Sequence, residues 1–420
     1  MRKREFLKRA SLMSFAMPFS LSSIQHLFQS VDGLPASQVA TDEDFWARIR
    51  AGYRLKPDYI NLENGYYCML PEETLDAYIE LIREVNYHAS WYMRTEQWDN
   101  KKAMTAKLEA VAGVNPGEVA ITRNTTESLD LVIAGMPWEA GDEAVMAEQD
   151  YGAMLNQFKL MEKRYGIRRK VVSLPNHPKD DEEIVDLYAS AITDKTRLLM
   201  VCHMVNITGQ VLPIRKICDM AHERGVEVMV DGAHAFAHID FKIPDLNCDY
   251  YGTSLHKWLS VPLGAGLLYV HPSKVDNVWP LFAEDESADG SILRLNHTGT
   301  HPVATDLAIE SAIDYHQAIG IERKQERLNY LQHYWTSRVR DLPGVIVNTP
   351  ADRSRHGGIG NVGIEGMEPA DFAKRLLDDH KIWTVAINRP GVRGLRITPN
   401  VYTTTDELDA LIRAIGELSS

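Results

Sequence analysis

Two charged residues stand where charged side chains could perform chemistry. Asp231 follows the apolar run Val226–Val230 and precedes Gly232-Ala233-His234, a setting that suggests a carboxylate facing a cationic nitrogen. Lys257 comes twenty-six residues later, and an apolar, glycine-rich stretch follows it. A helix-capping aspartate and a lysine whose stem is buried while its ammonium reaches water are the ordinary alternatives.

Polar residues also follow three other apolar runs. Residues 123–126, Arg-Asn-Thr-Thr, open an expected helix, whose free N–H groups and positive dipole end suit a phosphate. Tyr151 could stack on a flat ligand, and Asn206 could donate a hydrogen bond to a ligand oxygen. Helix capping, a partly buried loop tyrosine and a turn asparagine are the corresponding structural alternatives.

The elements that must position these residues alternate along the chain. Strands followed by helices predict a parallel sheet covered on both faces, with ligands at the carboxyl ends of the strands. The fold class is therefore α/β, with a large doubly wound, mainly parallel sheet and a smaller α+β domain. The expected strands are Glu118–Thr122, Glu143–Ala147, Lys170–Ser173, Arg197–Cys202, Val226–Val230 and Gly266–Val270. The expected helices are Glu127–Ile133, Met154–Arg164, Glu182–Ile192, Ile214–Arg224, Ala304–Ala318 and Glu322–Leu342.

The pattern changes near Pro302, where long helical segments lead into a short mixed region. We therefore expect a large domain over residues 65–300 and a small domain built from residues 41–64 and 301–420. The 420 residues are enough for two or three folding units.

Composition excludes several classes of function. The formal net charge is −13, which disfavours a general nucleic-acid or anionic-membrane surface. No apolar stretch reaches the ~18 residues of a spanning helix. The four cysteines are scattered and form neither a disulfide framework nor a zinc spacing. No GxGxxG motif follows an early strand, which disfavours a dinucleotide-binding enzyme.

The first forty residues are typical of an export signal and linker. The string Lys3-Arg4-Glu5-Phe6-Leu7-Lys8 resembles a twin-arginine signal, with lysine at the first of the two basic positions, and a short apolar run follows it. We expect export to the periplasm or beyond, with a cytoplasmic protein carrying a basic amphipathic terminus as the alternative.

Together and in this order, these residues resemble the pyridoxal-phosphate (PLP) enzymes of fold type I, in the class V aminotransferase group. The resemblance covers about residues 60–405. Within that group, the string Asp231-Gly232-Ala233-His234-Ala235 and the overall layout are most similar to isopenicillin-N-epimerase-like proteins.

The resemblance implies a role for each candidate. Lys257 would form the Schiff base with the cofactor aldehyde and then move the α-proton, while Asp231 would keep the pyridine nitrogen protonated. Tyr151 stands where the group usually has a stacking histidine, so it offers a different acid at that position. The ring hydroxyl would contact Asn206 and His234, and the phosphate would contact Thr125, Thr126, Ser254 and His256.

Three further positions are implied for substrate and partner. Arg396 matches the arginine that grips the substrate carboxylate, with Arg393 as the competing choice, and Asn64 lies in a turn that touches substrate. Thr300 matches a residue that reaches the phosphate of the neighbouring subunit, which implies a homodimer with shared active sites. A domain-junction turn is the alternative for Thr300.

The reaction is less constrained than the cofactor. Cysteine desulfurases need a nucleophilic cysteine shortly before the carboxylate arginine, and residues 379–396 contain none. We expect an enzyme that removes the α-proton of an amino acid or derivative, resembling the epimerases. A β-eliminating C–S lyase and an aminotransferase are the alternatives. A silent binding protein is disfavoured because every cofactor position is chemically competent.

Overall fold

The structure is a computed structural model that describes residues 26–282 and 290–420. The predicted signal at the start of the chain lies outside these residues, and only residues 26–40 of the expected signal and linker fall within them. In the two described ranges, no helix has both the length and the apolar character needed to cross a membrane. The same ranges contain no group of His, Cys, Asp or Glu side chains arranged to hold a metal ion.

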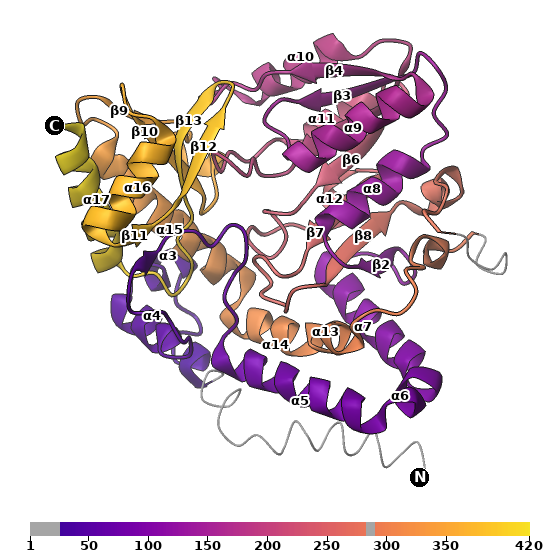
Figure 1. Ribbon diagram of the computed structural model, residues 1–420, viewed down its shortest axis with the longest axis horizontal. Coiled ribbons are helices and arrows are strands. Elements are labelled where there is room, and N and C mark those ends of the chain that lie inside the picture. Colours follow the sequence, from indigo (N-terminus) through magenta and orange to yellow (C-terminus); the bar gives the residue numbers. More distant parts are fainter. Residues whose placement is uncertain (1–25, 283–289) are drawn as a thin grey trace.

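A seven-stranded sheet forms the centre of the molecule (Figure 1). Its strand order is β2-β8-β7-β6-β5-β3-β4. The run from β4 to β7 is parallel, whereas β8 lies antiparallel to both β7 and β2. The bounds are β2 Val119–Thr122, β3 Glu143–Ala147, β4 Arg168–Val172, β5 Thr196–Cys202, β6 Glu227–Asp231, β7 Tyr250–Ser254 and β8 Gly266–Val270.

Helices cover both faces of this sheet because its inner strands are apolar on both sides. In β3, Val145 belongs to one buried core and Met146 to the other, as the two-residue period of a strand requires. Helices α8 and α9 pack on the second core, and α7, α10 and α11 pack on the first. Their bounds are α7 Gln97–Ala112, α8 Thr125–Gly135, α9 Gly152–Tyr165, α10 Asp181–Ala191 and α11 Ile214–His222.

A second, antiparallel sheet of order β12-β13-β10-β9 lies beside the first. Trp335 and Phe372 are among the buried side chains that join this sheet to its helices. The short strands β1 and β11 pair in parallel, which brings residues near position 60 to this part of the chain. The bounds are β1 Ile60–Asn61, β9 Val345–Val347, β10 Gly360–Ile364, β11 Ile382–Trp383, β12 Val385–Arg389, β13 Val392–Ile397, α15 Ile321–Val339, α16 Pro369–His380 and α17 Thr405–Ser419.

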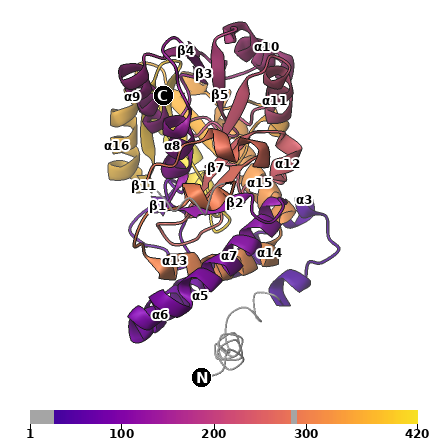
Figure 2. The same ribbon diagram turned by 90° about the vertical axis from the view of Figure 1, so that its right-hand side faces the viewer.

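Long helices run along one edge of the molecule. Figures 1 and 2 both place α5 there beside α13, with α6 at the far end of α5 and packed on α7. Helices α5 and α6 meet at Ala89, whose positive φ of 49° interrupts the helical path. The remaining bounds are α3 Ala36–Val39, α4 Glu43–Arg50, α5 Glu72–His88, α6 Ser90–Thr95, α12 Ile243–Leu246, α13 Val303–Leu307, α14 Ile309–Ile319, η1 Pro272–Asn277, η3 Ile292–Leu295 and η4 Arg353–Arg355.

The predicted α/β class with a mainly parallel sheet is confirmed, and each expected strand has a counterpart. Strand β7 was not among the expected strands. Its sequence, Tyr-Tyr-Gly-Thr-Ser, has no aliphatic run, yet every residue is buried between β6 and β8. This strand carries the chain directly to Lys257.

Candidate active site

A cavity of about 340 Å³ opens at the carboxyl ends of the central strands. Its size falls within the range of small-molecule sites, which starts at about 300 Å³. The cavity brings together residues from the large sheet and from the small one. The predicted site residues that line it are Thr125, Thr126, Tyr151, Asn206, Asp231, His234, Ser254, His256, Lys257 and Arg396.

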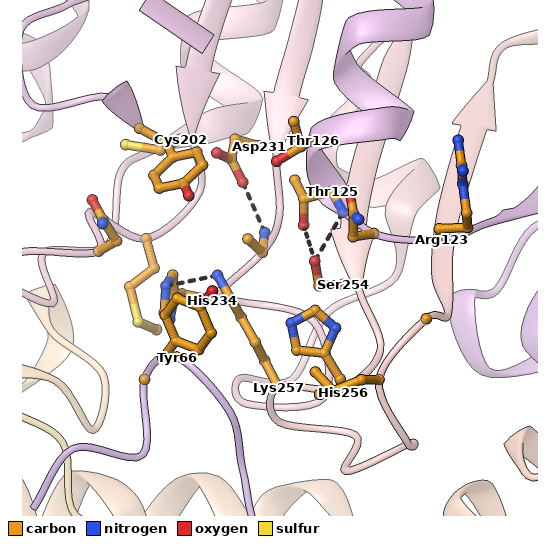
Figure 3. A pocket seen from close by; sticks show the side chains of 18 of the residues that line it. Tyr66, Arg123, Thr125, Thr126, Cys202, Asp231, His234, Ser254, His256 and Lys257 are labelled. Carbon is orange, nitrogen blue, oxygen red and sulfur yellow. Dashed lines mark hydrogen bonds between the residues drawn. The ribbon is translucent and has the colours of Figure 1, made fainter. Parts of the chain in front are cut away.

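Lys257 projects into the cavity from the loop after β7 (Figure 3). Its Nζ lies 3.0 Å from His234 Nε2, and the indole N–H of Trp258 donates to His234 Nδ1 over 3.4 Å. Since Nδ1 accepts this bond, the proton of the neutral imidazole belongs on Nε2, which can donate to Lys257 Nζ when the amine is neutral. Burial lowers the pKa of Lys257 to about 8, although Asp231 opposes the shift. The site thus raises the fraction of the neutral amine, the form that attacks a carbonyl, above that of an ordinary lysine, although the ammonium still predominates at pH 7.

Asp231 is the last residue of β6 and is buried at the cavity wall. One carboxylate oxygen, Oδ1, accepts the Ala233 N–H at 3.0 Å, which fixes the side chain. Burial raises the pKa of this carboxyl, and Lys257 opposes the rise. A buried carboxylate stabilises a cation that comes to lie against it. Asp231 can therefore stabilise the protonated ring nitrogen of an aromatic ligand bound in the cavity.

The start of helix α8 forms another part of the cavity wall, near Asp231 (Figure 3). Asn124 caps the helix by accepting the Glu127 N–H at 2.9 Å. Ser254 Oγ accepts the Thr125 N–H at 2.8 Å and lies 2.7 Å from Thr125 Oγ1 (Figure 3). A hydroxyl pair at a helix N-terminus is a suitable site for a phosphate.

His256 supplies a polar atom that has no partner among the described residues. Its Nδ1 is buried and makes no hydrogen bond, and burial lowers the pKa of the ring to about 4. A buried polar atom without a partner is costly unless a ligand satisfies it. The cavity therefore has an anion-binding part, an amine of lowered pKa and a buried carboxylate, which together fit the phosphate, aldehyde and pyridine nitrogen of PLP.

Arg396 enters the cavity from β13 of the small sheet. Its Nη1 donates to the Asn206 carbonyl oxygen at 3.2 Å, a contact that joins the two sheets. Arg393, the competing candidate, is exposed and pairs with Glu368 outside the cavity. Residues three apart on a strand point to opposite faces, so only one of these arginines can face the cavity.

Two predicted site residues do not line the cavity. Asn64 is fully buried, and its side chain accepts from the Tyr402 hydroxyl at 2.6 Å and donates to the Thr398 carbonyl at 2.8 Å. Its neighbour Gly65 lines the cavity instead. Thr300 is exposed, two residues after Thr298, which borders a small recess beside the cavity.

Several lining residues were not among the sequence predictions. Cys202 ends β5 beside Asp231, and the others, besides Gly65, are Tyr66, Arg123, Asn124, Met204, Ala233, Leu263 and Gly264. Cys202 could have been predicted, because it is the last residue of the expected strand Arg197–Cys202 and such positions face the ligand edge of a parallel sheet. The loop around Leu263 gave no comparable signal, because its place depends on the path of β7 and β8.

These features define a class of protein: a PLP-dependent enzyme of fold type I. Lys257 is the amine suited to the aldehyde, Asp231 the partner suited to the ring nitrogen, and the start of α8 the site suited to the phosphate. Bound PLP acts as an electron sink that acidifies the α-proton of an attached amino acid.

Comparisons with known proteins give the family. Residues 66–411 match the model named "Aminotransferase class-V", and the chain belongs to this family. The isopenicillin N epimerases of Streptomyces clavuligerus and Amycolatopsis lactamdurans are 27% and 29% identical to it, and each alignment covers 89% of this chain and 98% of the relative. The cysteine desulfurase of Haloferax volcanii is 25% identical, covering 85% of this chain and 88% of the relative. The family thus includes relatives that catalyse different reactions.

Solved structures agree on the fold. The apo cysteine desulfurase of Thermococcus onnurineus NA1 has a TM-score of 0.77 at 21% identity, covering 89% of this chain and 97% of that one. The cystine C–S lyase C-DES, in complex with cysteine persulfide, has a TM-score of 0.77 at 20% identity, covering 86% and 97%.

Proposed function

We propose that this enzyme inverts the α-carbon of an amino acid or an amino-acid derivative, as an isopenicillin-N-epimerase-like protein. The observation that carries the proposal is that the Lys257 amine and the Tyr151 phenol, two groups that can exchange a proton, line the same cavity. Inversion requires that a proton leaves the α-carbon and that a proton returns from the other side. One group can remove the proton, and the other can supply its replacement.

The contacts of Lys257 support its role as the base. His234 holds the amine at 3.0 Å, and the pKa of about 8 leaves a useful neutral fraction near neutral pH. Tyr151 precedes helix α9 with its side chain 45% exposed, so the phenol can exchange protons with water. The two epimerases among the relatives, each aligned over 98% of its length, support the same reading.

The cysteines argue against persulfide-forming desulfuration, the reaction named for other relatives. Cys202 lines the cavity, but burial and the neighbouring Asp150 raise the pKa of its thiol well above the ordinary value. Burial raises the pKa of Cys68 to about 12. A thiol becomes a nucleophile only as the thiolate, so neither residue is suited to this role.

A panel of L- and D-amino acids, incubated in deuterium oxide with the PLP-loaded enzyme, tests the proposal. We expect α-deuteration with formation of the opposite isomer for at least one substrate. Tyr151→Phe should keep α-deuteration in the starting isomer and lose inversion, while Lys257→Ala should lose both. Release of keto acid would indicate a transaminase, and release of sulfide with pyruvate would indicate a β-eliminating lyase. Either result without inversion would refute the epimerase proposal.

We also propose that the enzyme works as a homodimer. The edge formed by α5, α6 and α7 exposes large aromatic side chains, with Tyr87, Trp91 and Trp98 exposed by 82%, 65% and 68%. Large exposed apolar patches mark interfaces. If Thr300 serves the partner's phosphate site, mixing inactive Lys257→Ala and Thr300→Asp chains should restore activity in mixed dimers. Sedimentation as a monomer would refute the proposal.

Export remains a proposal that rests on residues 3–8 and the short apolar run after them. N-terminal sequencing of protein from fractionated cells tests it. A shortened chain in the exported fraction is expected, and an intact Met1 in the cytoplasm would refute it.

A further inference from the structure

The guanidinium that faces the cavity is already paired inside the protein. The Glu63 carboxylate accepts two hydrogen bonds from one side of the Arg396 guanidinium: Nε donates to Oε2 at 3.2 Å, and Nη2 donates to Oε1. Both side chains are nearly buried, with 10% of Arg396 and 8% of Glu63 exposed. A two-point contact of this kind fixes the plane of the guanidinium as well as its position.

Glu63 is itself held in place by the backbone and by neighbouring side chains. It follows strand β1, forms a parallel bridge with Thr398, and its N–H donates to Asn61 Oδ1 at 3.0 Å. On the other side, Gly65 packs so closely that an added Cβ would lie 3.1 Å from Arg396 Cζ. Glu63 itself does not line the cavity, so its carboxylate holds Arg396 in place without facing the ligand space.

The donors of Arg396 can be counted. A guanidinium has five N–H groups. Glu63 accepts two of them, and the Asn206 carbonyl accepts a third at 3.2 Å. Among the described residues no further acceptor is bonded, so two N–H groups remain, one on Nη1 and one on Nη2, the number that a single carboxylate takes in a bidentate pair.

We propose that Glu63 is a positioning residue that presents Arg396 to one substrate carboxylate and makes that carboxylate the preferred anchor. This inference rests on the proposed amino-acid substrate. Because Glu63 already balances the charge of Arg396, an anion gains little from charge alone. Recognition then depends on whether the ligand matches the two remaining donors. A planar carboxylate on the α-carbon matches them, whereas a carboxamide, which offers one acceptor oxygen, does not.

Binding titrations of the PLP-loaded enzyme test this role. The probe is the standard L-amino acid that changes the absorption spectrum of the parent most strongly, compared with its own carboxamide. In Glu63→Ala, the Kd of the amino acid should rise by at least ~10-fold, the size expected for one lost hydrogen bond to a charged group. The Kd of the carboxamide should change by less than about twofold. Glu63→Gln keeps one acceptor and should fall between the parent and Glu63→Ala.

Glu368→Ala is the matched control. It removes the carboxylate that pairs with Arg393, an arginine on the same strand as Arg396 but outside the cavity. It should change neither Kd. Two results would overturn the inference: unchanged or tighter amino-acid binding in Glu63→Ala, or an equal loss for the amino acid and the carboxamide, which would indicate general damage. If Glu63→Ala does not fold, Glu63→Gln decides: the Kd of the amino acid should rise more than the Kd of its carboxamide. If no amino acid perturbs the parent spectrum, the proposed function itself fails.

Discussion

Lys257 should react as a neutral amine near physiological pH. A pKa of about 8, lowered by burial, leaves about 9% of the amine neutral at pH 7. An ordinary lysine, with a pKa near 10.4, leaves about 0.04%, so the structure gives Lys257 a ~200-fold advantage. Asp231 opposes this shift, because its negative charge favours the ammonium. Asp231→Asn should therefore lower the pKa of Lys257 further.

Reductive methylation with limiting formaldehyde, carried out on the PLP-free protein and followed by peptide mass spectrometry, measures this pKa. The labelling rate of Lys257 should rise with pH, reach half its maximum near pH 8, and reach it at lower pH in Asp231→Asn. Lys374 is the internal control, because it is exposed and its ion pair with Asp378 raises its pKa. Pyridoxal phosphate should protect Lys257 and leave Lys374 unprotected. A common pH profile for the two lysines, or a higher midpoint in Asp231→Asn, would refute the reasoning.

Three further changes have defined outcomes. Ser254→Ala removes a hydroxyl at the start of α8 and should weaken PLP binding ~10-fold in equilibrium dialysis; unchanged binding would place the phosphate elsewhere. Gly209→Ala should lower the free energy of unfolding by about 1–3 kcal/mol in urea titrations, and an unchanged midpoint would contradict this. The reason is that φ of Gly209 is +77° and an added Cβ would lie 1.9 Å from the Ile359 carbonyl oxygen. Arg327→Met removes a fully buried cation that bonds Ala40 and Thr403 carbonyls and should cost about 3 kcal/mol in the same titration, whereas a gain in stability would show that packing outweighs these bonds.

The parts of the site that could be predicted lie just after strands. Asp231, Asn206 and Tyr151 each follow an apolar run, and a parallel sheet gathers such positions at one edge. The helix start at Thr125 was visible for the same local reason, since capping residues precede an amphipathic segment. These inferences need only periodicity and the rule that parallel strands end together.

The remaining parts depend on contacts between distant segments. Glu63 and Arg396 are 333 positions apart, and nothing in either local sequence indicates the pair. Asn64 looked like a site residue, but the strand pairing near Thr398 turns its side chain into the protein interior. Strand β7 was hidden because its burial comes from its neighbours in the sheet rather than from an apolar sequence of its own.

The hydrogen bond from Arg396 to the Asn206 carbonyl joins two residues 190 positions apart, so the two sides of the site are synthesised at different times. Asn206, Asp231 and Lys257 leave the ribosome long before Arg396, and domains generally fold as units during synthesis. Val392 of β13 and Tyr402 belong to the same buried core as the inner strands of the large sheet, so that core is complete only once these residues have been made. Arg396 is thus the last of the four groups to be synthesised, and the site can be complete only after translation has passed β13.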